Sequence, residues 1–203
     1  MSDWVYSDIV KEHFMNPQNI FDEKEEFRVD GRGQVGNVKC GDEMKFVISV
    51  NKKDNTIEDC RWRTYGCASA IASTSLLSEA IKGMPLEEAF NISPKEIAKR
   101  LGGLPENKIH CSVLGDKALR AAINDYYVKN NMPEKVREDK AKVICECMHI
   151  TDHEIEDAVL EGARTYLDVQ EHTKVGTVCG GCREKTEELI HAYITKHFGE
   201  MTK

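Results

Sequence analysis

Cysteine is the residue type in this sequence best suited to chemistry, and its spacing is uneven. Eight cysteines occur among 203 residues. A chain of this length without an export signal is expected to keep its thiols reduced, and clustered reduced cysteines more often serve metal or redox chemistry than disulfide scaffolds. Seven of the eight fall into two sets. The eighth, Cys60, lies in a predicted strand, and we interpret it as a structural residue.

The first set consists of three cysteines far apart in the chain, each at a predicted element boundary. Cys40 precedes a strand, Cys67 begins a helix, and Cys111 begins another. The positive end of a helix lowers thiol pKa and favours an anionic cluster. Three thiolates and the imidazole of His110 suffice for a tetrahedral zinc ion or for the irons of a cluster. Spacing alone fits three buried structural cysteines and a surface histidine equally well.

The second set consists of a Cys-x-Cys and a Cys-x-x-Cys motif. Its members are Cys145, Cys147, Cys179 and Cys182. Residues two apart in an extended segment point to one face, and residues three apart at a helix start also share a face. We therefore expect the four sulfurs to converge, with glycines 180 and 181 permitting a tight loop. Zinc and a [2Fe–2S] cluster both fit this geometry.

Hydrophobic periodicity predicts the elements that position these cysteines. Alternating apolar residues predict a strand over 44–50 with one buried face, paired in a hairpin with 56–65. Helical spacing predicts helices over 6–14, 68–81 and 112–130. Residues 31–36 are expected to form a glycine-punctuated connection.

A change of composition predicts a second domain. Residues 131–142 are polar and charged and are interpreted as a linker between domains 1–130 and 143–203. In the second domain, Thr151 and Glu154 have the spacing of a capping box, and a last helix is predicted from about 179 to 198.

Charge and hydropathy exclude several classes of function. The formal net charge is −7, which argues against nucleic acid or an anionic membrane as a partner. No apolar run approaches the roughly 18 residues of a membrane span, and residues 1–4 lack a signal-peptide pattern. We therefore expect a cytoplasmic protein.

Three motifs around the first set resemble the IscU/NifU family of iron–sulfur cluster scaffolds. They are Val35–Asp42, Thr64–Ser73 and Lys108–Leu114, and the segment His13–Asn19 is similar to the family's opening segment. The resemblance covers roughly residues 1–130 and implies an α+β, IscU/SufE-like domain with a small antiparallel sheet. Ala68 replaces the family's glycine, and the segment before His110 departs from the Leu-Pro-Pro-Val-Lys of the chaperone-dependent IscU branch. These residues are closer to the NifU branch.

The resemblance also implies residue roles, partners and cofactors. A transient [2Fe–2S] or [4Fe–4S] cluster, or zinc, would be held by Cys40, Asp42, Cys67, His110 and Cys111. Cys111 would accept sulfur from a cysteine desulfurase. The Asp42 carboxylate is a hard donor beside soft thiolates, which should keep the cluster labile. The assembled cluster would pass to apo iron–sulfur proteins, and the family is expected to form homodimers.

The second set resembles the BFD-like central domain of NifU proteins. The resemblance rests on Ile144–Cys147, on Thr151 with its helix, and on Val178–Cys182, and it covers about 143–198. It implies a small all-α domain with a permanent [2Fe–2S] cluster on Cys145, Cys147, Cys179 and Cys182. Full-length NifU proteins carry a third domain with another Cys-x-x-Cys, and we expect this chain, which ends at Lys203, to lack that carrier function.

The sequence therefore predicts a NifU-type assembly scaffold without turnover chemistry of its own. Two other classes stay open. A [2Fe–2S] electron carrier would use its N-terminal domain only to dock partners, and a structural zinc protein would be colourless.

Overall fold

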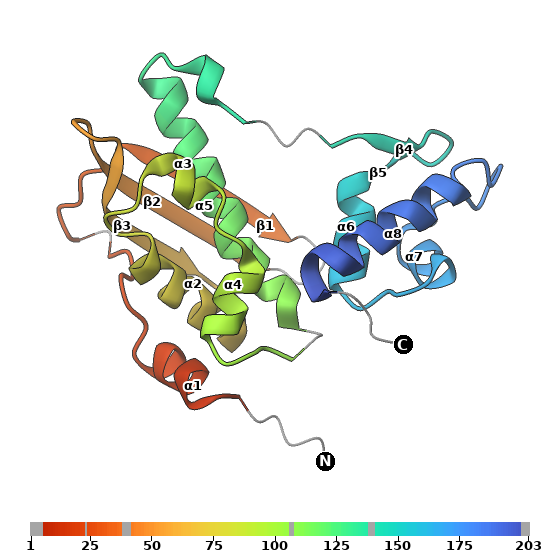
Figure 1. Cartoon of the computed structure of the whole chain (residues 1–203), viewed down its shortest axis with the longest axis horizontal. Helices are drawn as coiled ribbons and strands as arrows, with labels where there is room; N and C mark the ends of the chain where they lie inside the picture. Colours follow the sequence, from red (N-terminus) through yellow and green to blue (C-terminus); the bar gives the residue numbers. More distant parts are fainter. Residues whose placement is uncertain (1–5, 23, 38–41, 106–107, 138–140, 200–203) are drawn as a thin grey trace. The chain divides into compact units, whose positions relative to one another are not determined.

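The computed structural model describes residues 6–22, 24–37, 42–105, 108–137 and 141–199. For Asn37, Asp42, His110 and Cys111 it describes the backbone alone. Contacts divide the chain into two compact units, residues 1–104 with 111–138 and residues 105–110 with 139–203. We call them the first unit and the second unit and describe each by itself (Figure 1). Among the described residues, no helix is long and apolar enough to cross a membrane.

A three-stranded antiparallel sheet organises the first unit. Its strands are β1 (Gly31–Asn37), β2 (Asp42–Asn51) and β3 (Thr56–Thr64), in the order β1-β2-β3. The predicted hairpin is confirmed, and its inward side chains, among them Phe46 and Trp62, are buried. The prediction that β2 has only one buried face is wrong at Val47 and Ser49, which lie on its other face and are each 5% exposed. Val47 lies in a hollow with Phe21, and the Ser49 hydroxyl donates to Glu58.

Helices cover the inner face of this sheet (Figure 1). α2 (Ala68–Ala80) and α5 (Ile109–Lys129) lie against it, and α1 (Asp8–Met15) packs on α2. The short helices α3 (Leu86–Phe90) and α4 (Pro94–Arg100) follow α2 in the chain. The three longer helices begin and end within about three residues of the predicted bounds.

β1 is a strand that glycine content concealed. Glycine disfavours strands, so residues 31–36 were expected to form a connection. A Cβ atom on Gly33 would lie 2.0 Å from the Ala118 carbonyl oxygen, and one on Gly31 would lie 2.3 Å from the Ala122 carbonyl oxygen. The two glycines therefore let the backbone of α5 approach β1 more closely than any other residue would allow.

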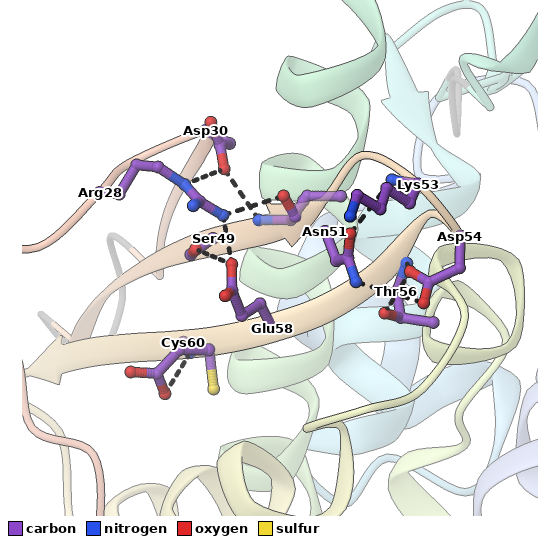
Figure 2. Close-up of polar contacts among 11 residues, drawn as sticks. Arg28, Asp30, Ser49, Asn51, Lys53, Asp54, Thr56, Glu58 and Cys60 are labelled. Atoms are coloured by element: carbon purple, nitrogen blue, oxygen red, sulfur yellow. Dashed lines mark hydrogen bonds and ion pairs between the residues drawn. The ribbon is translucent and has the colours of Figure 1, made fainter.

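Ion pairs lie at the end of the sheet where β1 begins and β2 ends (Figure 2). Arg28 lies 2.9 Å from Asp30 and 2.5 Å from Glu58, and it donates to the Val50 carbonyl oxygen at 2.9 Å. Asp30 in turn accepts from the Val50 amide at 2.8 Å. These contacts join the segment before β1 to both strands of the hairpin, but solvent screening of the exposed Arg28 keeps each ion pair weak.

Part of the predicted linker is bonded to the first unit. A 3-10 helix, η2 (Pro133–Lys135), follows α5. The Arg137 amide donates to the Asn124 side chain at 3.1 Å, and Asn124 donates to the Arg137 carbonyl oxygen at 2.9 Å. The domain limits 1–130 and 143–203 and the linker 131–142 stay predictions.

The second unit is a small helical fold with a two-stranded pair. β4 (Val143–Cys145) pairs with β5 (Ile150–Thr151), and three helices follow: α6 (Asp152–Leu160), α7 (Tyr166–Thr173) and α8 (Arg183–Phe198). The predicted capping box of Thr151 and Glu154 is confirmed. The sequence did not predict α7, which begins with a second capping box from Thr165 to Asp168.

A buried carboxylate joins α6 to α8. Glu156 is 5% exposed, and its Oε1 lies 2.7 Å from both Lys196 Nζ and His197 Nε2. Burial raises the pKa of Glu156, but the hydrogen bonds and charges of His197 and Lys196 outweigh it and lower the pKa to about 2. The ionised carboxylate is therefore a stabilising part of the second unit.

Glu156→Gln should lower the free energy of unfolding of the second unit by about 3 kcal/mol at neutral pH. Because the folded pKa lies below the ordinary value of 4.5, this stability is present above pH 4.5 and is lost as the pH falls towards 2. Urea denaturation at pH 7, 4.5 and 3.5 should show the gap to the unmodified chain narrowing in acid. Glu171→Gln, an exposed change on α7, is the control, and an equal gap at all three pH values would contradict the assignment.

Candidate cluster-binding sites

The four cysteines of the second unit meet as two pairs. The thiol of Cys147 lies 3.4 Å from that of Cys179, and the thiols of Cys145 and Cys182 share a hydrogen bond. Each pair takes one cysteine from each motif. A [2Fe–2S] cluster takes two thiolates on each of its two irons, so two pairs are the arrangement it needs. Within the described parts of the chain, no group of three His, Cys, Asp or Glu side chains is placed to hold a single metal ion.

The inner pair is largely removed from solvent. Cys145 is 2% exposed, and Cys182 packs against the core of the second unit. Burial alone would raise the pKa of Cys145, but the backbone amides of Gly176 and Met148 and the Cys182 thiol donate to its sulfur and lower the pKa. Burial and the donated hydrogen bond raise the pKa of Cys182. Within the pair, the Cys182 thiol is therefore the hydrogen-bond donor and the Cys145 sulfur is the acceptor.

The outer pair lies at the surface. Cys147 and Cys179 are both exposed. The Gly181 amide donates to the Cys179 sulfur at 3.5 Å and, with the Cys147 thiol, lowers the pKa of Cys179. The donated hydrogen bond and the like charge of Cys179 raise the pKa of Cys147. Metal binding would release the thiol protons, and the exposed pair would leave one edge of a bound cluster accessible to a redox partner.

Gly176 is a site residue that the motifs did not indicate. Its amide bonds to the Cys145 sulfur, and a Cβ atom added to it would lie 2.0 Å from the Tyr166 hydroxyl oxygen and 3.5 Å from Cys182 Sγ. Its φ of +69° also favours glycine. The sequence feature that could have identified Gly176 is its position three residues before Cys179.

The local geometry expected for this set was wrong in two respects. The last helix begins at Arg183 rather than near 179, because Gly180 takes a φ of +69° and Cys182 is the N-cap of α8. Cys147 lies in a turn after β4, so the Cys145 and Cys147 thiols pair with the other motif instead of lining one face of an extended segment.

The first set is described only in part. Cys67 is the N-cap of α2 and is partly exposed, and the backbone of Cys111 lies in the first turn of α5, both as predicted. Cys40 and the side chains of Asp42, His110 and Cys111 lie outside the described residues. Their convergence with Cys67 stays a prediction.

The two helices that begin at these cysteines touch each other. A Cβ atom on Gly115 of α5 would lie 2.7 Å from Thr74 Oγ1 of α2. This close approach lies about one turn after Cys111 and about two turns after Cys67. The helix crossing is therefore compatible with a shared site at the two N-termini.

Cys60 is a structural residue, as expected. It lies on β3, is fully buried, and its thiol donates to the Ser78 carbonyl oxygen at 3.2 Å (Figure 2 shows its place on the strand). Burial raises the pKa of Cys60 to about 12. A thiol that stays protonated is a poor metal ligand, so Cys60 is a suitable control for the other seven.

Comparison with known protein families identifies the domain to which each half of the chain is similar. Residues 5–133 match the NifU-like N terminal domain, and residues 143–192 match the BFD-like [2Fe-2S] binding domain. The chain belongs to the family of proteins with a NifU-like N-terminal domain. The resemblance seen in both halves of the sequence is thereby confirmed, and so is an α+β fold followed by a helical [2Fe–2S] domain.

Individual relatives match either most of the chain or about two thirds of it. The nitrogen fixation protein NifU of Trichormus azollae is 40% identical over 92% of this chain. The iron-sulfur cluster assembly scaffold protein IscU 1 of Archaeoglobus fulgidus is 48% identical over 66% of this chain and 84% of its own length. A crystal structure of a nitrogen-fixing NifU-like protein (N-terminal) from Brucella abortus has 18% identity and a TM-score of 0.49, over 63% of this chain and 97% of that one. The chain covers 63% of the length of the Trichormus protein.

Proposed function

We propose that this chain is a scaffold for iron–sulfur cluster assembly. It accepts sulfur from a cysteine desulfurase, takes up iron, builds a transient cluster and passes it to apo-proteins, without enzymatic turnover of its own. The observation that carries the proposal is the match of residues 5–133 to the NifU-like N-terminal domain, with 48% identity to a relative named as a scaffold. The cytoplasm as its location and the homodimer as its state belong to the same proposal.

The chemistry of the first set suits this role. Cys67 and Cys111 are placed at helix N-termini, where the helix dipole favours the thiolate. The Cys111 thiolate would attack the sulfane sulfur of a desulfurase persulfide, releasing the desulfurase thiolate and leaving a persulfide on Cys111. Two electrons then convert that persulfide to sulfide and the Cys111 thiolate. Cys40, Asp42, Cys67 and His110 would hold the iron and the nascent cluster.

The second unit fits a resident [2Fe–2S] cluster. Its two thiol pairs offer four sulfur ligands, one pair buried and one exposed. When bound, such a cluster supplies one electron at a time. Because Cys147 and Cys179 are exposed, electrons would have a short path between the cluster and a redox partner. Backbone amides around Cys145 stabilise negative charge on its sulfur. We propose electron supply to persulfide reduction as the role of this unit, with a purely structural cluster as the alternative.

The test measures iron and acid-labile sulfide per chain under anaerobic conditions. Samples are taken before and after incubation with desulfurase, cysteine and ferrous iron, and again after a chelator or an apo-ferredoxin. A scaffold gains iron and sulfide, and only the added part is lost to the chelator or the acceptor. Iron that is present from the start and can be neither added nor removed would instead define an electron carrier, and a colourless protein with tightly held zinc would define a structural zinc protein.

Cys111→Ser should abolish the added iron and sulfide while leaving the resident [2Fe–2S] absorbance unchanged. The loss is expected to exceed tenfold, because a serine hydroxyl cannot carry a persulfide. Cys60→Ala is the matched control, since its buried thiol has no place at either site. Normal loading of Cys111→Ser would remove Cys111 from the proposed role.

A further inference from the structure

The outer face of the first unit's sheet, opposite the buried core, is strongly basic. Of the residues that strand alternation places on this face, two from each strand line a common hollow. They are Arg32 and Gln34 on β1, Lys45 and Val47 on β2, and Arg61 and Arg63 on β3. The strand register aligns them in two rows, Arg32–Val47–Arg61 and Gln34–Lys45–Arg63. Four of these six positions carry a cation, on a chain whose net charge is −7.

These six side chains line a hollow. Together with Phe21 and Tyr65 they enclose a cavity of about 320 Å³. Small-molecule sites typically occupy about 300–1,000 Å³. Directly opposed side chains in neighbouring strands are about 5 Å apart, and the two rows are about 7 Å apart. The four cations can therefore reach one compact ligand together.

The described acidic groups neutralise these charges only in part. Lys45 lies directly opposite Arg63, and like charges at opposed positions destabilise a sheet. Three acidic groups lie nearby: Asp59 is 2.6 Å from Arg61, Glu43 accepts from Gln34, and Asp125 accepts from the Arg32 backbone amide at 2.7 Å. Across the described part of the chain, the ammonium of Lys45 and the guanidinium of Arg32 have no acidic group within ion-pair distance. A bound anion would relieve the repulsion between the cations.

Aromatic rings orient two of the guanidinium groups. Arg61 lies over the ring of Phe27 at 5.1 Å, and Arg63 lies over the ring of Tyr65 at 5.5 Å. Arg61 Nη1 also donates to Asp59 at 2.6 Å and to the Cys60 carbonyl oxygen at 2.8 Å. A guanidinium held in this way loses less freedom when it binds an oxyanion. The hollow thus combines oriented forks, one ammonium group and the Gln34 amide.

We propose that this hollow is a binding site for a small multivalent oxyanion, with at least two carboxylate or phosphate groups a few ångströms apart. One group would lie across the Arg32–Arg61 row and the other across the Lys45–Arg63 row. Arginine forks suit carboxylates and phosphates alike, so the shared oxyanion chemistry defines the class. None of the eight residues that line the hollow belongs to either cysteine set, and the proposal does not depend on the scaffold function.

The test titrates the full chain in 150 mM salt with two probes, inorganic pyrophosphate and tricarballylate, by calorimetry and by amide chemical shifts. We expect one probe to bind with a Kd below about 1 mM and to shift the amides of Arg32, Lys45 and Arg61. Pyrophosphate binding at least tenfold tighter would identify a phosphate ligand, and the reverse a polycarboxylate.

Lys45→Gln and Arg63→Gln should each weaken binding at least tenfold. Both changes are on exposed side chains, so the fold should be retained. Lys129→Gln removes one exposed cation at the far end of α5 and should change the affinity less than twofold. The proposal is overturned if neither probe binds at this salt concentration, or if all three variants weaken binding equally, as a diffuse charge effect would.

Discussion

Cys145→Ala should remove the resident [2Fe–2S] cluster from the second unit. The as-isolated iron and sulfide, about two of each per chain, should fall by at least tenfold together with the visible absorbance. Cys145 is the buried partner of Cys182 and accepts hydrogen bonds from three backbone amides, those of Gly176, Met148 and Cys147. Its loss would leave three thiolates for a cluster that takes four.

Iron, sulfide and circular dichroism in the visible range check this prediction. Cys60→Ala should keep the full complement of iron, because the Cys60 thiol is buried with a pKa of about 12. The free energy of unfolding separates loss of the cluster from loss of the fold, since truncating one buried sulfur costs only about 1–2 kcal/mol directly. A Cys145→Ala chain that retains tightly bound iron would disprove the four-cysteine assignment.

Gly33→Ala should unfold or severely destabilise the first unit. The added Cβ would lie 2.0 Å from the Ala118 carbonyl oxygen and 2.6 Å from the Ala122 amide nitrogen of α5. Both contacts are with helix backbone, and β1 is held by its ladder to β2, so neither side can move cheaply. We expect a loss of about 3 kcal/mol or more in the free energy of unfolding, at the upper end of overpacking costs.

Urea denaturation of the chain should show this loss as a lower midpoint for the unfolding of the first unit. Gln34→Ala, on the same strand but on the outer face, should change the free energy of unfolding by about 0.5 kcal/mol or less. Because Cys111 lies in the first turn of α5, a Gly33→Ala chain that still folds should also load the transient cluster poorly. Unchanged stability would mean that α5 can shift away from β1 without cost.

Local patterns in the sequence were sufficient for much of the fold. The β2–β3 hairpin was predicted from apolar residues that alternate with other residues in the sequence. The capping box was predicted from Thr151 and Glu154, whose types and spacing of three are typical of that motif. Both depend on residues close together in the chain, where periodicity and hydrogen bonding act directly. The two cysteine sets and their family resemblance were equally visible, because metal ligands cannot be exchanged for other residue types.

Elements without a periodic signal were not predictable in the same way. β1 is rich in glycine and forms because α5 packs against Gly31 and Gly33. α7 has little apolar periodicity and is positioned by Val169, which is fully buried in the core of the second unit. In both cases a long-range contact outweighs the local preference.

The sequence by itself determined which residues this protein can use: seven cysteines suited to clusters, an aspartate and a histidine beside them, and the hairpin and helices that carry them. Only the tertiary structure decided how they meet. The sulfurs of the second unit pair across the two motifs because Gly180 reverses the chain before α8. The basic hollow exists because strand register brings Arg32 into the same row as Arg61 and Lys45 opposite Arg63, although the members of each pair are far apart in the chain. Register and helix crossings arise from packing between distant segments, which no local pattern encodes.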